Sequence, residues 1–323
     1  MAEVPALRVG VVVDASCDLP PDTLRDAGLN VLPIELVLAE GIRRDTRDPE
    51  ATQRFYARDL EAKGSRAEAR ALSAEVIRAW FGEHIAERYD YVFCLTLMQT
   101  RGTLFENASK ASFAILNDVN TQRKQSDKPP FALRVVDSRT LSAGLGVLAL
   151  EAADMVAAGR SPNDIRRRLD TLRDHICAYF VPGDLYYLRT RAVSRGERSV
   201  NFFTYALGST LSVKPVILCY RGETQTLTKV RGYDRAVERV LLHLATQLRL
   251  GVLSKHVCIS FGGDPARIRT LPGYQALAET VRSLDMTLHE TFMSAATAIN
   301  AGPSVLSVAY AGDLRPFGDR ATP

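Results

Sequence analysis

Cysteine is scarce in this sequence, and its few thiols form no pattern. The 323 residues include five cysteines, which lie far apart without any Cys-x-x-Cys pair. An odd number of isolated thiols argues against a disulfide framework and against a cysteine-based zinc site, so we expect reduced, buried thiols in a cytosolic protein. Cys17 lies in a polar turn before a helix, where either a reactive thiol of lowered pKa or a small structural residue fits.

Long apolar runs are missing as well. No uncharged stretch approaches the length of a membrane span, and the first residues lack a basic segment followed by an apolar core. We therefore expect a cytoplasmic protein without stable membrane insertion. The net charge of +4 is scattered along the chain, with no basic stripe of interleaved aromatic residues. Nucleic-acid binding is not expected, and the arginines at 166–168 are assigned to a solvated helix face.

Familiar catalytic and cofactor motifs are absent from the sequence. It contains no glycine-rich dinucleotide or phosphate loop, no HExxH, no paired Cys/His spacing and no GxSxG elbow. The five histidines are isolated, and His84, His175 and His243 fall within helical patterns that suggest structural roles. We predict a protein that is not an enzyme and that uses no cofactor or metal.

Strand-like runs alternate with helical patterns in the first half of the chain. Strands are predicted over 7–13, 30–38, 91–97 and 131–136, and helices over 21–27, 49–62, 73–87, from 103 onward and over 141–158. The polar segment 117–130 is predicted to be a surface loop. This alternation is typical of an α/β fold with a parallel sheet that helices cover on both faces.

The second half follows a different pattern, which predicts a second α/β domain with a mixed sheet. Ser161 and Pro162 open a helix as its N-cap and first residue. Strands are predicted over 214–220, 225–230, 256–261, 286–290 and 305–310, the first two forming a hairpin through 221–223, and helices over 234–250 and after 262–264. We place the boundary near Gly159, which gives domains of 1–159 and 160–323.

The most informative stretch is residues 95–108, where a strand gives way to a helix. Arg101, Gly102 and Thr103 lie at this transition. A helix N-terminus offers free backbone N–H groups and the positive end of the helix dipole. Gly102 lets a ligand approach the backbone, Thr103 offers a hydroxyl, and Arg101 offers a forked cation suited to a carboxylate or phosphate. An anionic head group is the expected ligand of this turn.

Acidic residues follow other strands of the first half. Asp14 and Asp18 come after the first strand, and Asp137 comes after the fourth. In open α/β sheets the ligand crevice lies beyond the carboxyl ends of the strands, which favours a role at a site. The alternative is that these carboxylates only cap helices.

Several short motifs, in order along almost the whole chain, resemble those of the DegV family, a bacterial group that binds long-chain fatty acids. The opening strand and turn at residues 11–20 (Val-Val-Val-Asp-Ala-Ser-Cys-Asp-Leu-Pro) resemble the family's first strand and its Asp-Ser…Asp-Leu-Pro turn. Further matches are 31–34, the Asp-Ser segment at 134–138 with the glycines that follow it, the Leu-Gly…Leu…Lys-Pro signature at 207–215 and Lys-Val-Arg at 229–231.

The head-group motifs depart from the family pattern. The family's Thr-Ser-Gln-Pro-Ser is matched to 64–68, which keeps one hydroxyl at Ser65, and its Ser-Gly-Thr turn is matched to 101–103, where Arg101 replaces the serine. Its His-x-Gly-Pro-Gly is matched to 300–304, with Asn300 in place of the histidine and Gly302 retained, and its Gly-Gly-Arg to 196–198, ending in Arg198. The resemblance assigns ligand-binding roles to Ser65, Arg101, Gly102, Thr103, Arg198, Asn300 and Gly302.

The resemblance implies a two-domain protein that holds an acyl chain between its domains. The first domain would carry the head-group site, and the second would close over the chain. The resemblance thus implies a cytosolic carrier of a long-chain fatty acid or a similar anionic amphiphile. Such a carrier could present its ligand to a fatty-acid kinase. Loss of binding through the altered motifs, a regulatory module that uses lipid as a signal, and an enzyme acting on a small phosphorylated or carboxylated substrate are the alternatives.

Overall fold

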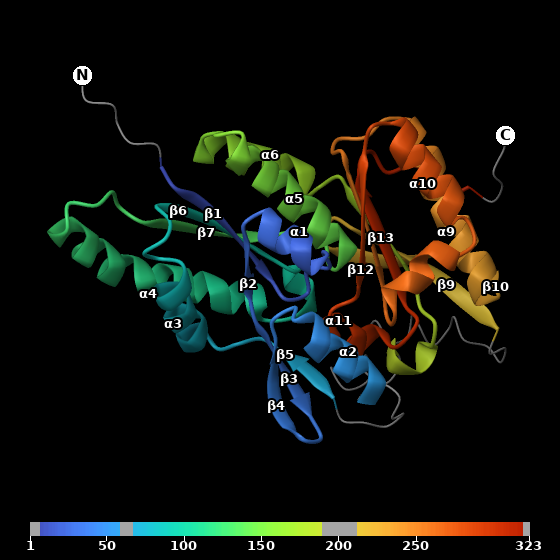
Figure 1. Cartoon of the computed structure of the whole chain (residues 1–323), viewed down its shortest axis with the longest axis horizontal. Coiled ribbons are helices and arrows are strands. Elements are labelled where there is room, and N and C mark those ends of the chain that lie inside the picture. Colours follow the sequence, from blue (N-terminus) through green and yellow to red (C-terminus); the bar gives the residue numbers. More distant parts are fainter. Residues whose placement is uncertain (1–6, 59–66, 189–211, 319–323) are drawn as a thin grey trace.

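The computed structural model describes residues 7–58, 67–188 and 212–318, and Figure 1 shows them as two lobes. The first lobe is built on a four-stranded sheet in the order β2-β1-β6-β7, with every neighbouring pair parallel. Its strands are β1 (Val9–Asp14), β2 (Leu29–Leu32), β6 (Tyr91–Thr96) and β7 (Ala132–Asp137). Helices α1 (Pro21–Asp26) and α5 (Ala143–Ala157) cover one face, and α3 (Ala74–His84) and α4 (Leu104–Gln125) cover the other. The predicted parallel sheet with helices on both faces is confirmed.

A small antiparallel sheet extends the first lobe. Its order is β4-β3-β5, from β3 (Ile34–Leu38), β4 (Gly41–Asp45) and β5 (Glu68–Arg70), and α2 (Pro49–Arg58) follows β4. The single strand predicted over 30–38 is therefore wrong, because β2 and β3 belong to different sheets. Pro33 separates them, and a residue without an N–H group cannot continue the ladder.

The second lobe is built on a six-stranded sheet in the order β10-β9-β8-β13-β11-β12. Only β11 and β12 run parallel, so the predicted mixed sheet is confirmed. Its strands are β8 (Ile176–Val181), β9 (Val213–Tyr220), β10 (Glu223–Arg231), β11 (His256–Phe261), β12 (Thr287–Phe292) and β13 (Leu306–Ala311). Its helical segments are α6 (Pro162–Leu172), α9 (Tyr233–Arg249), the 3-10 turn η2 (Pro265–Thr270), α10 (Tyr274–Ser283) and α11 (Ala295–Ala301).

Helix α5 joins the two lobes by packing between their sheets, as Figure 1 shows. It contacts β1 and β6 on one side and β8, β11 and β13 on the other, so one apolar core is continuous across both lobes. Gly146 makes this close approach possible, because a Cβ there would lie 3.1 Å from the Asp18 carbonyl oxygen and 3.2 Å from the Cys258 sulfur. The boundary near Gly159 remains a prediction.

Three further sequence predictions have clear outcomes. Ser161 caps α6 by accepting a hydrogen bond from the Asp164 N–H group, and the 221–223 hairpin joins β9 to β10, as predicted. The loop predicted over 117–130 is wrong up to Gln125, because α4 continues to that residue. Its polar last turns still bury one face, on which Val119 and Arg123 lie.

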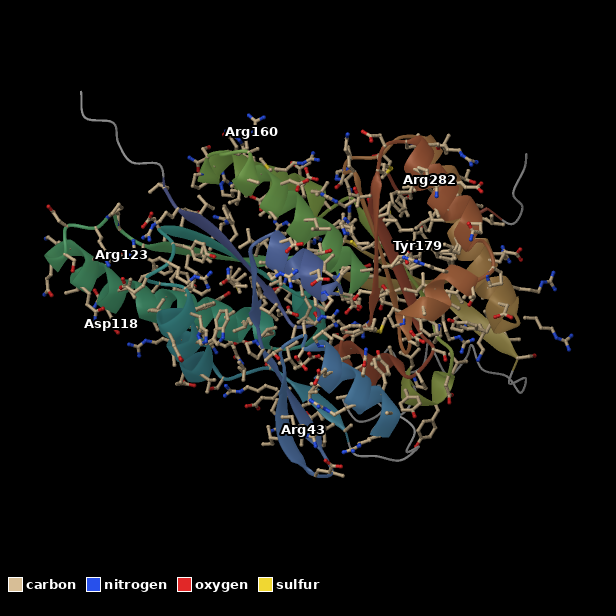
Figure 2. All side chains as sticks on the ribbon, viewed as in Figure 1. Arg43, Asp118, Arg123, Arg160, Tyr179 and Arg282 are labelled. Atoms are coloured by element: carbon tan, nitrogen blue, oxygen red, sulfur yellow. The ribbon has the colours of Figure 1, made fainter. Side chains whose placement is uncertain are left out.

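Arg123 belongs to a buried charge cluster at the far end of the first lobe, away from the second lobe (Figure 2). It donates from Nη1 to Asp90 Oδ1 at 2.9 Å and from Nη2 to the Ala86 carbonyl oxygen at 2.6 Å. Arg8 also donates to Asp90, and these hydrogen bonds hold the pKa of the Asp90 carboxyl well below its usual range. This pair provides a comparison for the buried charges described below.

All five cysteines are free and buried. Burial raises the pKa of Cys17 well above its ordinary value, which overturns the interpretation as a reactive thiol of lowered pKa. No helix in the described ranges is long and apolar enough to span a membrane. Nor do those ranges contain a cluster of three His, Cys, Asp or Glu side chains that could hold a metal ion.

Candidate functional site

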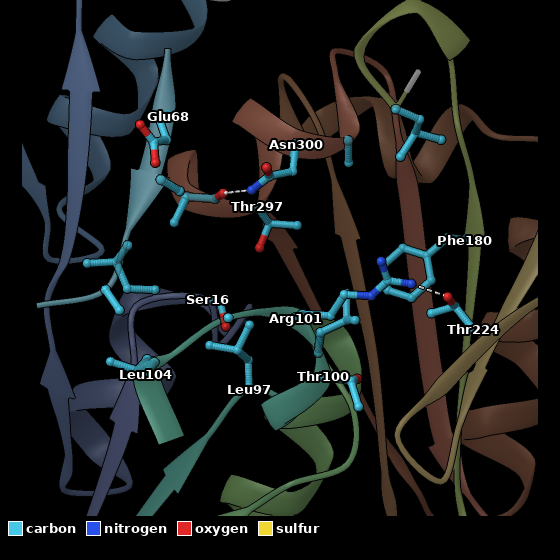
Figure 3. Close-up of a pocket in the computed structure, with 18 of the residues that line it drawn as sticks. Ser16, Glu68, Leu97, Thr100, Arg101, Leu104, Phe180, Thr224, Thr297 and Asn300 are labelled. Atoms are coloured by element: carbon cyan, nitrogen blue, oxygen red, sulfur yellow. Dashed lines mark hydrogen bonds between the residues drawn. The ribbon is translucent and has the colours of Figure 1, made fainter. Parts of the chain in front are cut away.

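A cavity of about 530 Å³ lies between the two lobes. The first lobe contributes apolar side chains such as Leu97 and Leu104, and the second contributes Phe180, Ile217 and Val305. In Figure 3, Leu104 of the first lobe and Phe180 of the second lie on opposite sides of the view, and the Arg101 side chain extends toward Thr224. We call the side of the cavity lined by Arg101 and Thr224 its margin. Volumes of this size are typical of small-molecule sites, which combine apolar walls with a few placed polar groups. The cavity lies beyond the carboxyl ends of the parallel strands, where the α/β topology predicts a crevice.

Two carboxylates at and just after the end of β1, those of Asp14 and Asp18, hold the backbone of the cavity walls in place. Asp14 is fully buried and accepts hydrogen bonds from the N–H groups of Ser16 at 2.8 Å and Leu97 at 2.6 Å, and both of these residues line the cavity. Burial raises the pKa of Asp14 to about 6. Asp18 reaches into the second lobe, where it accepts from the Ser294 N–H group at 2.8 Å. Neither carboxylate caps α1, whose N-terminus has no side-chain cap, so these residues hold loops in place.

The turn that follows β7 holds the second lobe against the side of the cavity on which Arg101 lies. Asp137 accepts from the backbone N–H groups of Gln99 at 3.1 Å and Arg139 at 3.0 Å. The tip of the β9–β10 hairpin then docks on these loops, since Thr100 donates from Oγ1 to the Gly222 carbonyl oxygen at 2.9 Å. Gly222 N–H donates in turn to the Arg139 carbonyl oxygen at 2.7 Å. The hairpin therefore closes one side of the cavity.

The predicted anion turn lies on the cavity. Residues 99–101 form the 3-10 turn η1 (Gln99–Arg101) between β6 and α4, and Arg101, Gly102 and Thr103 all line the cavity wall. Arg101 donates from Nη2 to Thr224 Oγ1 of β10, which fixes the guanidinium at the margin (Figure 3). A Cβ added to Gly102 would meet no atom within 4 Å, and the Thr103 side chain makes no capping bond to α4. The turn thus offers a cation, an uncovered backbone and a hydroxyl on one surface.

The other predicted site residues are placed differently. Asn300 on α11 lines the cavity and donates from Nδ2 to the Ala296 carbonyl oxygen at 2.9 Å. Gly302 follows α11 with φ of 86° and is not among the residues that line the cavity. A Cβ added to Gly302 would lie 2.7 Å from the Tyr187 ring. Ser65 and Arg198 lie outside the described residues.

The sequence prediction missed several residues of the cavity. Glu68 and Arg70 on β5 line it and approach each other at 3.4 Å, and Thr224 provides the partner for Arg101. The prediction assigned β5 no secondary structure, and three residues give too short a pattern to find it. Thr224 lies in a strand that was predicted, but only the docking of two lobes shows that it meets Arg101.

The fold and the cavity define a two-lobed α/β protein with a largely apolar cavity between its lobes. The family of uncharacterised DegV proteins matches residues 8–313 by its family model. A DegV domain-containing protein of Xanthomonas campestris pv. campestris is 40% identical over 312 residues, covering 96% of this chain and 99% of the relative. A DegV domain-containing protein of Xanthomonas axonopodis pv. citri is equally similar, at 40% over 312 residues. The chain belongs to the DegV family, which confirms the predicted resemblance.

Solved structures share the fold at lower identity. The protein described as DegV, a fatty acid binding protein from Bacillus subtilis, aligns with a TM-score of 0.72 at 18% identity, covering 95% of this chain and 100% of that one. A stearic acid-binding protein from Eubacterium ventriosum aligns with a TM-score of 0.71 at 20% identity, covering 94% and 98% of the two chains. These structures establish the shared architecture.

Proposed function

We propose that this chain is a binding protein for a long-chain fatty acid or a similar anionic amphiphile. The observation that carries the proposal is a largely apolar cavity between the lobes with the Arg101 guanidinium fixed at its margin. Structural neighbours are described as fatty-acid-binding proteins, one of them with stearic acid, which supports the same ligand class. An acyl chain would lie between Leu104 of the first lobe and Phe180 of the second, with its acid group toward Arg101.

The energetics assign different roles to the two parts of such a ligand. Burying one CH₂ group contributes about 0.8 kcal/mol, so sixteen carbons contribute on the order of 12 kcal/mol before the costs of ordering. A charge-assisted hydrogen bond contributes roughly 1.5–3 kcal/mol net. The apolar walls therefore dominate affinity, and the margin around Arg101 sets orientation and head-group choice. This division explains how an arginine can stand where the family has a serine while binding persists.

The cation at the margin favours an ionised head group. An arginine presents a planar fork of N–H donors that matches a carboxylate or phosphate and that stays charged at any physiological pH. The bond from Arg101 to Thr224 holds this fork in place before a ligand arrives, which lowers the ordering cost of binding. We therefore assign the head group to an ionised acid, with Gly102 and Thr103 beside it and Asn300 on the facing wall.

The same proposal covers the protein's wider role. Residues 1–159 would form the head-group domain and 160–323 the domain that closes over the acyl chain, with Ser65 and Arg198 completing the site. The chain would act as a cytosolic carrier rather than as an enzyme, and it could present the acid group to a separate fatty-acid kinase. These roles rest on the family resemblance.

Native mass spectrometry of protein purified from cells tests the proposal. We expect adducts with the masses of long-chain acids, and we expect added oleate to raise the melting temperature. Absence of co-purified lipid, together with an unchanged melting temperature at saturating oleate, would contradict the carrier function. A short dicarboxylate or sugar phosphate that raised the melting temperature instead would favour a small-substrate site.

A further inference from the structure

Residues 292–296, which we call the connector, join β12 to α11 and hold a wall of the cavity. Its last two residues already belong to α11, which presents Thr297 and Asn300 to the cavity. Helices of seven residues have little stability of their own, because nucleation costs more than so few hydrogen bonds return. The position of this wall must therefore come from contacts with the rest of the molecule.

Side chains of the first lobe hold most of the connector, while the Met293 N–H group bonds within the second lobe by donating to the Phe261 carbonyl oxygen at 2.8 Å. The Phe292 carbonyl oxygen accepts from Arg47 Nη2 at 3.1 Å, and the Met293 carbonyl oxygen accepts from the Tyr56 hydroxyl at 2.9 Å. The Ser294 N–H group donates to Asp18 Oδ1 at 2.8 Å, and the Ala296 N–H group donates to Asp45 Oδ2 at 3.0 Å. Four backbone groups within five residues are thus bonded across the interface between the lobes.

Three of these first-lobe side chains form a buried charge cluster. Asp18, Asp45 and Arg47 are each at most 4% exposed. Arg47 Nη1 lies 3.6 Å from Asp18 Oδ1, and the Arg47 N–H group donates to Asp45 Oδ1 at 3.0 Å. The Arg47 backbone has φ of 63°, a strained conformation for a residue with a side chain.

This charge cluster is not expected to contribute much to the free energy of unfolding. Two carboxylates face one guanidinium, and Arg47 Nε has no hydrogen-bond partner among the described residues. Burial raises the pKa of Asp18 to about 6, although Arg47, Ser260 and the Ser294 N–H group oppose that shift. Buried ion pairs are weak sources of stability because desolvation offsets their attraction, and local rules tend to be broken where function requires it.

We propose that Asp18, Asp45 and Arg47 are positioning residues for the ligand site, acting through the connector to place α11. The inference rests on the proposed function for its ligand and on the contacts above for its mechanism. None of the three side chains lines the cavity. Their effect on a ligand is therefore indirect, through the positions of Thr297 and Asn300.

The test compares Asp18→Asn with Asp90→Asn. Each substitution neutralises a buried carboxylate that is paired with a buried arginine, but Asp90 lies in the remote cluster with Arg123. We expect Asp90→Asn to unfold at lower urea concentration at pH 7, because Arg8 and Arg123 stabilise the ionised Asp90 carboxylate, whereas the raised pKa of Asp18 predicts a smaller loss of stability for Asp18→Asn. Only Asp18→Asn should weaken oleate binding, by about tenfold or more, and only it should speed amide hydrogen exchange in α11 by a similar factor.

Tyr56→Phe is the second variant, in case Asp18→Asn does not fold. It removes one donor to the connector and leaves every charge in place, so faster exchange in α11 and weaker oleate binding are again expected. Equal exchange in α11 for wild type, Asp18→Asn and Tyr56→Phe would overturn the inference, as would oleate affinity unchanged in both variants. If the wild-type protein does not bind oleate, the proposed function fails on that result, and hydrogen exchange alone decides whether these residues position α11.

Discussion

Replacing Arg101 by methionine should separate recognition of the acid group from recognition of the acyl chain. Methionine keeps an apolar, flexible stem at the margin of the cavity and removes the guanidinium that donates to Thr224. The acyl chain would keep its contacts with the apolar walls, so the loss should fall on ligands with an ionised head group.

The size of the effect follows from the charge-assisted bond. Losing a net 1.5–3 kcal/mol corresponds to roughly a 10- to 150-fold weaker dissociation constant for oleate, because each 1.4 kcal/mol is tenfold. Oleyl alcohol has the same chain and a neutral head group, so its affinity should change by less than about threefold. The ratio of the two affinities isolates the charge from the packing.

The assay is calorimetric or fluorescence titration of both ligands against wild type, Arg101→Met and the matched control Arg43→Met. Arg43 lies on the exposed strand β4, and its replacement by methionine changes the net charge of the protein by the same amount as Arg101→Met does. The control should bind both ligands as wild type does. An equal loss of acid and alcohol binding in Arg101→Met would remove Arg101 from the head-group site, and no loss for either would show that the acid lies elsewhere.

Four further outcomes follow from the structure. Thr224→Val removes the hydroxyl that orients Arg101, so oleate titration should show a loss that is clear but smaller than that of Arg101→Met. Gly302→Ala forces a side chain into positive φ and against the Tyr187 ring, which should lower the free energy of unfolding in urea by about 1–3 kcal/mol. The pKa values of Asp14 and Asp18 are raised by burial from 3.8 to about 6, so the folded chain takes up these protons first as the pH falls. Each group should therefore add about 2–3 kcal/mol of stability as the pH falls from about 7 to about 3, and Asp18→Asn should remove its share in urea titrations across that range. Finally, the buried thiols should react with a thiol reagent only after urea is added, and rapid reaction of the native protein would contradict their burial.

Much of the fold was predictable because local patterns agreed with tertiary packing. The helix that begins near Thr103, the Ser161 cap and the 221–223 hairpin each carry their signal within a few residues. The failures occurred where local composition and global packing disagree. The last turns of α4 are polar, but Arg123 within them is buried and paired with Asp90. No residue near Arg123 in the sequence indicates this pairing.

From residue patterns alone, the candidate site was predictable only on the side that one segment builds, and Asn300 on the facing wall was assigned through the family resemblance. Residues 101–103 adjoin a strand and a helix that are both evident in the sequence, and they do line the cavity. The facing wall comes from residues more than a hundred positions away, such as Thr224, and its placement depends on how the lobes dock. Glu68 and Arg70 belong to a strand too short to show an alternating pattern. The periodicity of apolar residues predicts single helices and strands. A cavity between lobes depends instead on how elements that are distant in the sequence pack against each other.

The bonds that hold the connector have a consequence for biosynthesis. They join partners 237 to 276 residues apart in the chain, so one half of each bond leaves the ribosome long before the other. During that interval the carboxylates of Asp18 and Asp45 and the Arg47 guanidinium stay hydrated, and contacts of such separation form slowly. A nascent or prematurely terminated chain that ends before residue 292 has no α11 wall. Under the proposed function, such a truncated chain should bind oleate less tightly than the full polypeptide, because one wall of its cavity is missing.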